Sequence, residues 1–228
     1  MAHILITSGP TRQYLDPVRF LSNESSGRMG AALAAAALGH GHQATIVSGP
    51  VQVSYPDGCT VIPVTTTAEM LSACRDVLPS TQGVIGAAAP CDYMPIHVAS
   101  SKLVKTNQPL QLELIETSDI IATLAEERTA GQWVVGFALE TDDPRFRALM
   151  KLEQKNCDMI ILNEPSAMNT RHTTVEVIQR DGTTLGIFQG PKLEVAVSIM
   201  QEIQQQLIQP PLASAKPEEP SQLPPQGG

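Results

Sequence analysis

The sequence is poor in aromatic residues, which make up only 4% of its 228 positions. Its core has to be built from Ala, Val, Ile and Leu, because hydrophobic residues still account for 42% of the chain. Cysteine is scarce too, and no two of the four cysteines have the CxxC spacing of a zinc site or redox pair. The five histidines form no HExxH pattern. These absences argue against a disulfide framework and against a structural zinc site.

The chain also lacks an excess of positive charge and a long apolar run. Its formal net charge is −8, whereas binding to nucleic acid requires a basic surface, so we expect no nucleic-acid partner. No apolar run approaches the ~20 residues that span a bilayer, so we expect no membrane partner. The N-terminal "MAHILITSGP" has neither a basic lead nor a cleavage pattern, and it favours a strand over a signal peptide. A cytoplasmic location follows as an expectation.

Short apolar runs alternate with helical patterns along the chain. Runs without polar alternation, separated by helices, are typical of parallel strands that are buried on both faces. The pattern predicts an α/β fold, a Rossmann-like doubly wound and mostly parallel sheet. Expected strands are 3–7, 43–48, 60–64, 83–89, 133–139 and 158–162, and expected helices are 26–39, 67–78, 118–128, 145–156 and 191–208.

Two features complete the predicted organisation. Asp181-Gly182 separates two alternating runs within 173–188, which indicates a hairpin added antiparallel at one edge of the sheet. From residue 209 onward the chain is rich in Pro and Gln and poor in apolar residues. We therefore predict one domain over 1–208 and a disordered tail over 209–228.

The connection after the first strand is too long for a dinucleotide-binding turn. Gly9 follows the strand directly, but the next glycines are Gly27 and Gly30, at the start of the next helix. Glycines at this spacing more often allow close packing than ligand binding, and the serines beside them could simply cap the helix. A helix start also attracts anions, and the neighbouring residues could hold a phosphate or a polar acyl group: Arg19, Asn23, Ser25, Ser26 and Gly27.

Two groups of lysines offer positive charge. Lys102 and Lys105 lie in a long segment without periodicity, which could close over a polyphosphate or could be an ordinary solvated loop. Lys151 and Lys155 are four residues apart on a predicted helix, so they share a face and repel each other. An anion between them would relieve that repulsion, although a solvated face is the alternative.

Several longer motifs occur together in one order. They are "ILITSGPTRQYLDPVRFLSNESSGRMG", "AAAPCDYMP", "KLVK", "SDII", "VVGFALET" and "KLEQKNCDMIILNEPS". This series closely resembles the phosphopantothenate–cysteine ligase family (phosphopantothenoylcysteine synthetases) over about residues 3–205. The resemblance is far more specific than a single glycine pattern.

The resemblance implies a two-step ligation in coenzyme A biosynthesis. The carboxylate of 4′-phosphopantothenate attacks the α-phosphate of CTP or ATP, which releases pyrophosphate and leaves an acyl nucleotide. The amine of cysteine then displaces the nucleoside monophosphate. The family also implies Mg²⁺ as the metal that accompanies the triphosphate, with unknown protein ligands, and a homodimer. We expect a stand-alone synthetase without the decarboxylase domain.

The resemblance also assigns roles by position. Asn23 and Lys102 match catalytic positions, and Arg19 with Ser25, Ser26 and Gly27 matches the substrate pocket. Nucleotide-binding positions are Gly9, Ala89, Asp92, Lys102, Ser118, Asp119, Ile120, Ile121, Phe137, Lys151 and Lys155, with Ser118 expected to be the N-cap of its helix.

The chain departs from the family pattern at four places. Ser118 replaces the proline of the family's P-D-I, and Pro90-Cys91 precedes Asp92 where the family has a small alanine. Val104 replaces a flap lysine, and Glu164-Pro165 changes the loop after the last parallel strand. Two alternatives stay open: an NAD(P)-binding Rossmann-type oxidoreductase, and a catalytically idle binding protein descended from the ligase.

Overall fold

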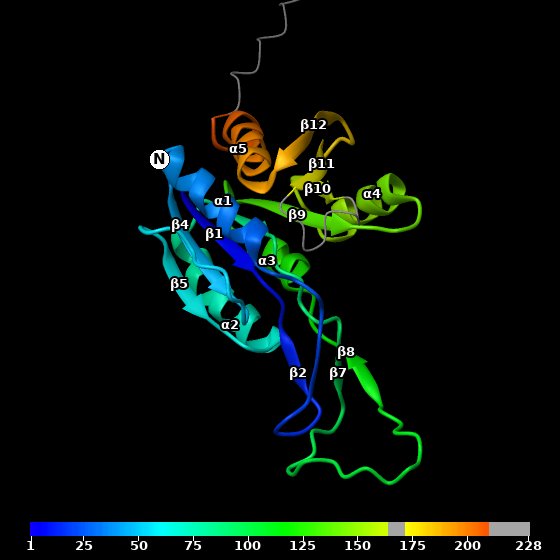
Figure 1. Cartoon of the computed structure of the whole chain (residues 1–228). Coiled ribbons are helices and arrows are strands. Elements are labelled where there is room, and N and C mark those ends of the chain that lie inside the picture. The colour runs from blue at the N-terminus through cyan, green and yellow to red at the C-terminus, as the bar shows by residue number, and fades with distance from the viewer. Residues whose placement is uncertain (164–171, 210–228) are drawn as a thin grey trace, which may run out of the picture.

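The computed structural model describes residues 1–163 and 172–209, and a single large sheet organises them (Figure 1). Its eight strands lie in the order β12-β11-β10-β9-β6-β1-β4-β5. The strands are β1 (His3–Ser8), β4 (Gln43–Ser48), β5 (Thr60–Pro63), β6 (Gly83–Gly86), β9 (Trp133–Leu139), β10 (Met159–Asn163), β11 (His172–Gln179) and β12 (Thr184–Pro191).

Strand directions confirm the predicted fold class. The pairs from β5 to β10 are all parallel, whereas β11 pairs antiparallel with both β10 and β12. The predicted hairpin is therefore the antiparallel edge of the sheet. Its turn contains Gly182, whose φ of 84° favours glycine. The fourth expected strand ends at Gly86, before the predicted residue 89, because the chain turns there and Ala89 joins Pro10 in an isolated bridge.

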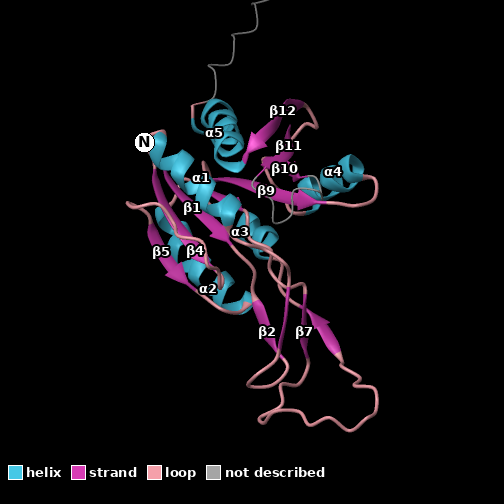
Figure 2. Ribbon diagram, viewed as in Figure 1, coloured by secondary structure: helices cyan, strands magenta, loops and turns pink. Residues whose placement is uncertain are grey.

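Helices cover both faces of the sheet (Figure 2). Side chains of α1 and α5 pack into one layer of the core, and side chains of α2, α3 and α4 pack into the other. The helices are α1 (Arg28–Gly39), α2 (Thr67–Val77), the 3₁₀ turn η1 (Leu78–Ser80), α3 (Ile120–Glu127), α4 (Pro144–Gln154), α5 (Lys192–Ile203) and the π-helical turn η3 (Gln204–Ile208). No helix within 1–163 or 172–209 has the length and apolarity needed to cross a bilayer.

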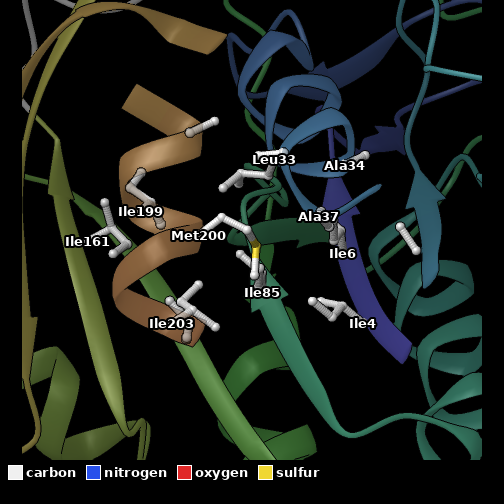
Figure 3. Packing of buried hydrophobic residues seen from close by; sticks show 14 of the residues in the cluster. Ile4, Ile6, Leu33, Ala34, Ala37, Ile85, Ile161, Ile199, Met200 and Ile203 are labelled. Carbon is white, nitrogen blue, oxygen red and sulfur yellow. The ribbon is translucent and has the colours of Figure 1, made fainter. Parts of the chain in front are cut away.

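The core is aliphatic, as the scarcity of aromatic residues predicts. Figure 3 shows Met200 of α5 reaching toward Ile85, with Leu33 of α1 beside it. The one tryptophan, Trp133, lies at the start of β9, and its indole ring occupies the space where Gly83 of the neighbouring strand has no side chain. A Cβ on Gly83 would lie 2.1 Å from that ring, so a glycine is needed for the close approach.

Two short hairpins, which the sequence pattern did not predict, extend from the body of the fold. They pair β2 (Arg12–Tyr14) with β3 (Phe20–Ser22), and β7 (Tyr93–Pro95) with β8 (Leu114–Glu116). Figures 1 and 2 show β2, β7 and the long connection from β7 to β8 projecting away from the sheet. We call this projection the arm (residues 12–22 and 93–116). Each arm strand has three residues, too few to display the period of two that marks a strand.

Some expected boundaries shift and some expectations fall outside the described residues. The helix expected from residue 26 begins at Arg28, because Gly27 is left-handed with a φ of 72°. Asp119, and not the expected Ser118, is the N-cap of α3. The predicted disordered tail lies outside the described residues from 210 onward, as does the Glu164-Pro165 departure.

Candidate functional site

A pocket of about 320 Å³ lies where the order of the parallel strands changes direction. From β1 the chain proceeds to β4 and β5 on one side, and it returns to the other side with β6. Ligands of doubly wound sheets collect at this switch point, beyond the carboxyl ends of the strands. The pocket is lined by Thr7, Gly86, Ala88, Pro90, Asp92, Tyr93, Glu116, Thr117, Ser118, Asp119, Ile120, Ile121, Phe137 and Lys155.

The start of α3 forms one wall of this pocket. Asp119 caps the helix by accepting a 3.0 Å hydrogen bond from the Ala122 N–H, and its other oxygen lies 2.9 Å from Lys155 Nζ. Burial alone would raise the pKa of Asp119. The Ala122 N–H and the Lys155 ammonium outweigh burial, so the pKa lies below its usual value. Asp119 is therefore an anion at neutral pH and holds Lys155 at the pocket.

We predict a pH-dependent effect for Asp119→Asn. Asparagine still caps α3 but loses the charge that pairs with Lys155, so at pH 7 the free energy of unfolding should fall by about 0.5 kcal/mol, a small value because water screens the partly exposed pair. The folded pKa lies below the unfolded value of 3.8. The stabilisation is thus complete above pH 3.8 and declines as the pH falls toward the folded pKa.

Urea unfolding at pH 7 and at pH 3 tests this prediction. The difference between the wild type and Asp119→Asn should be smaller at pH 3. Equal differences at both pH values would show that the charge of Asp119 does not stabilise the fold.

The opposite wall is formed by the segment after β6. The side-chain amide of Asn23 donates to the Pro90 carbonyl at 2.8 Å and reaches Asp92 Oδ2 at 3.4 Å. The Thr117 N–H donates to the Asp92 carbonyl at 2.8 Å. Asn23, which is distant in sequence, thus contacts two residues that line the pocket, Pro90 and Asp92, without lining it itself.

A network of buried hydroxyl groups holds this wall in place. The Cys91 N–H donates to Thr11 Oγ1 at 2.8 Å, and the Cys91 carbonyl accepts from Thr117 Oγ1 at 2.7 Å and Thr67 Oγ1 at 3.3 Å. Thr11 and Thr67 are themselves 2.8 Å apart, and Gln13 donates to Thr67 at 2.9 Å. Sequence reasoning missed this network. The threonines in "GPT" and "TTTAE" were its only signal.

The start of α1 lacks a side-chain cap. Gly27 is the N-cap, with no side-chain hydrogen bond to the first helical N–H groups. Ser25 and Ser26 precede it and are half-buried. Gly9 and Gly27 both have positive φ, and a Cβ on either would lie within 2.8 Å of Val51 Cγ1. The glycines are therefore needed for close packing, while the helix start stays available for an anion.

Nine predicted site residues lie outside the lining of the main pocket: Gly9, Arg19, Asn23, Ser25, Ser26, Gly27, Ala89, Lys102 and Lys151. The Arg19 guanidinium is occupied by Asp16 and the Leu103 carbonyl. Lys102 is exposed on the connection between β7 and β8. Ala89 donates its N–H to the Gly9 carbonyl at 2.9 Å, while its neighbour Ala88 lines the pocket.

The expected anion-binding pair of lysines is separated. Lys155 faces Asp119 in the main pocket, whereas Lys151 lies 2.5 Å from Glu140 Oε1 and lines a second hollow of about 500 Å³. The Glu140 oxygen accepts no hydrogen bond of regular geometry, so its contact with Lys151 is an ion pair. Each lysine has a carboxylate partner, and the expected repulsion is relieved without a bound anion.

Carboxylates also line the main pocket. Asp92 and Glu116 both belong to its wall. Over residues 1–163 and 172–209, no three His, Cys, Asp or Glu side chains gather closely enough to form a metal site by themselves. A metal held by one or two carboxylates together with ligand phosphates needs no such cluster.

The sheet and the position of the pocket define a Rossmann-like α/β protein with a pocket at its switch point. The chain belongs to the family described as the DNA/pantothenate metabolism flavoprotein C-terminal domain, whose sequence pattern matches residues 1–207. This membership confirms the resemblance noted in the sequence.

Named relatives agree with this assignment. The chain is 39% identical over 206 residues to the coenzyme A biosynthesis bifunctional protein CoaBC of Bacillus subtilis (strain 168). This match covers 88% of this chain and 50% of the relative. It is 45% identical over 165 residues to the CoaBC protein of Vibrio cholerae serotype O1, and this match covers 72% of this chain and 41% of the relative. The chain therefore spans about half the length of these curated relatives.

Solved structures share the fold. The crystal structure of the C-terminal domain of a CoaBC protein superposes with a TM-score of 0.74 at 35% identity, covering 89% of this chain and 93% of that domain. The crystal structure of the DNA/pantothenate metabolism flavoprotein from Streptococcus pneumoniae superposes with a TM-score of 0.76 at 21% identity. The superposition covers 90% of this chain and 99% of that chain, and at this identity it shows the fold alone.

Proposed function

We propose that the chain is a phosphopantothenate–cysteine ligase, which joins 4′-phosphopantothenate and cysteine through an acyl nucleotide formed from CTP or ATP. The observation that carries the proposal is the switch-point pocket, whose walls bring together the motif residues Asp92, Asp119 and Phe137. Asn23 lies beside the pocket, hydrogen-bonded to its lining residues Pro90 and Asp92. A solved relative that is 35% identical carries the name of a coenzyme A biosynthesis protein, which supports the same conclusion.

The first step needs a nucleotide held beside a carboxylic acid. The carboxylate of phosphopantothenate attacks the α-phosphorus, the bond to the bridging oxygen breaks, and pyrophosphate leaves with the bonding electrons. Residues 118–121 and Phe137 would hold the nucleoside, while Gly9, Lys102 and Lys155 would face its phosphates. Positive charge near the leaving pyrophosphate stabilises the charge that develops in the transition state.

Mg²⁺ would be held by Asp92 and Glu116, together with phosphate oxygens. These two carboxylates line one pocket, and Asp92 Oδ2 has only a long 3.4 Å contact with Asn23, so a metal could take that oxygen as a ligand. When bound, the metal would neutralise charge on the triphosphate.

The second step joins cysteine to the activated acid. The amine of cysteine attacks the acyl carbon, loses a proton and displaces the nucleoside monophosphate. Asn23 would then donate its amide N–H to the acyl nucleotide in place of the Pro90 carbonyl. Arg19, Ser25, Ser26 and Gly27 would border the acyl group, with the uncapped start of α1 supplying N–H donors.

Pyrophosphate release tests the function. The protein is mixed with phosphopantothenate, cysteine, Mg²⁺ and either CTP or ATP, and the choice of nucleotide is read from the two rates. We expect release that requires phosphopantothenate, with CTP the better substrate. No release with either nucleotide, combined with tight binding of NADPH or NADH, would favour the oxidoreductase. Nucleotide binding without release would favour the idle binding protein.

We further propose a homodimer that forms through the arm. Apolar side chains are exposed along it, with Val98 at 58%, Leu110 at 60% and Val104 at 84%. Clustered exposed apolar residues are typical of protein–protein interfaces. Sedimentation should give twice the chain mass of 24.4 kDa, and Leu110→Glu should reduce it toward the monomer. A monomer at micromolar concentration would contradict the proposal.

A further inference from the structure

Asp16 is a completely buried carboxylate at the turn between β2 and β3. Its Oδ1 accepts hydrogen bonds of 2.8 Å from the N–H groups of Val18 and Arg19. Its Oδ2 accepts from Arg19 Nε at 2.9 Å and from the Leu103 N–H at 3.1 Å. Burial alone would raise the pKa of Asp16, but these four donors lower it well below its usual range. The side chain is therefore ionised and fully hydrogen-bonded.

A purely local role leaves one of these four contacts, the one from Leu103, unexplained. An aspartate that accepts from the N–H groups two and three residues ahead stabilises its own turn, and Oδ1 does so. Oδ2 instead accepts from Leu103, which is 87 residues away in the sequence. The Arg19 guanidinium strengthens the same connection by donating to the Leu103 carbonyl at 2.5 Å.

A second contact fixes the connection a few residues earlier. The Ala99 N–H donates to the Leu15 carbonyl at 2.9 Å. Lys102 thus lies between two residues, Ala99 and Leu103, that are both hydrogen-bonded to the β2–β3 turn. The long connection between β7 and β8 is consequently held at the point from which the Lys102 side chain departs.

We propose that Asp16 is a positioning residue for Lys102, acting through Leu103 and Arg19 to hold the lysine segment against the β2–β3 turn. The role of Lys102 rests on the proposed function, but the contact itself does not. By fixing the backbone on both sides of Lys102 before the ligand arrives, the clamp reduces the conformational entropy that is lost when the lysine engages a phosphate.

Amide hydrogen exchange of the full chain tests the clamp without reference to activity. Asp16→Asn keeps the size of the side chain but replaces one carboxylate oxygen by an NH₂ group. In either orientation of the amide, two of the four N–H donors then face an NH₂ group instead of an acceptor. The Leu103 amide should exchange roughly tenfold faster, while amides of β1 and β6 keep their protection. Asp181→Asn is the matched control, because Asp181 also accepts a hydrogen bond from the N–H two residues ahead, at 2.9 Å from Thr183. It lies in the β11–β12 turn at one edge of the large sheet, whereas Asp16 lies in the separate β2–β3 hairpin.

Unchanged exchange at Leu103 in folded Asp16→Asn would overturn the proposal. If that variant loses protection in β1 and β6 as well, Arg19→Gln decides, since it removes the guanidinium contact to Leu103 and leaves the carboxylate in place. Faster exchange confined to residues 99–103 would support the clamp, and unchanged exchange there would refute it.

Pyrophosphate release with CTP, and separately with ATP, tests the positioning role. Asp16→Asn should lower the rate about tenfold, and the double variant with Lys102→Ala should be no slower than Lys102→Ala alone, because Asp16 acts through Lys102. If the rate losses of the two single variants multiplied in the double variant, the positioning role would be overturned. A wild type without activity would refute the proposed function instead, and the exchange measurement would still decide the clamp.

Discussion

Replacing Lys102 with alanine should lower the rate of pyrophosphate release by about 100-fold, because the reaction would lose a cation that stabilises charge on the departing pyrophosphate. The melting temperature should stay unchanged, since this exposed side chain contributes little to the core. The rates are measured with saturating phosphopantothenate and cysteine, and the melting temperature by circular dichroism.

Lys105→Ala is the matched control for this prediction. Lys105 is also exposed and lies on the same connection, but beyond the residues held by the clamp. Lys105→Ala should lower the rate of pyrophosphate release less than threefold, as expected for a solvated lysine. Equal losses in both variants would indicate a general effect of positive charge, and wild-type rates in Lys102→Ala would remove Lys102 from the mechanism.

Gly49→Ala should lower the free energy of unfolding by about 3 kcal/mol, the upper end of the range for overpacking. A Cβ on Gly49 would lie 1.6 Å from the Pro10 carbonyl oxygen, and a backbone atom cannot move aside as a flexible side chain could. The Gly49 N–H also donates to the Ser8 carbonyl at 2.9 Å, so the loop after β1 would shift together with its neighbour. Urea denaturation measures the loss.

Gly39→Ala separates this clash from the general effect of adding a methyl group. A Cβ on Gly39 meets no atom within 4 Å, and Gly39 ends a helix in which alanine is favoured. The control should be as stable as the wild type or slightly more stable. A Gly49→Ala variant that unfolds at the same urea concentration as Gly39→Ala would contradict the predicted clash.

The sheet could be predicted because its strands carry strong local signals. Continuous apolar runs identify β1, β4, β9 and β10, and Asp181-Gly182 identifies the edge hairpin. The pocket lining at 118–121 followed from motif resemblance. The arm could not be predicted, because each of its strands has only three residues, which is too few to display a strand pattern in the sequence.

The partners of charged side chains were also beyond the sequence. Arg19 was expected at the pocket, but Asp16 and Leu103 hold its guanidinium. Lys151 and Lys155 were expected to share an anion, but Glu140 and Asp119 pair with them separately. Spacing along a helix predicts which side chains share a face, while the carboxylates that meet them come from other elements. The hydroxyl network around Cys91 is unpredictable for the same reason.

The placement of Trp133 has a practical consequence for all of these measurements. As the only indole in the chain, it accounts for most of the fluorescence excited at long ultraviolet wavelengths. It is buried against Gly83 at the amino ends of β6 and β9, whereas the pocket opens at their carboxyl ends. Its emission should therefore change when the core unfolds and stay nearly constant when a nucleotide enters the pocket. Tryptophan fluorescence thus reports folding separately from ligand occupancy in one sample.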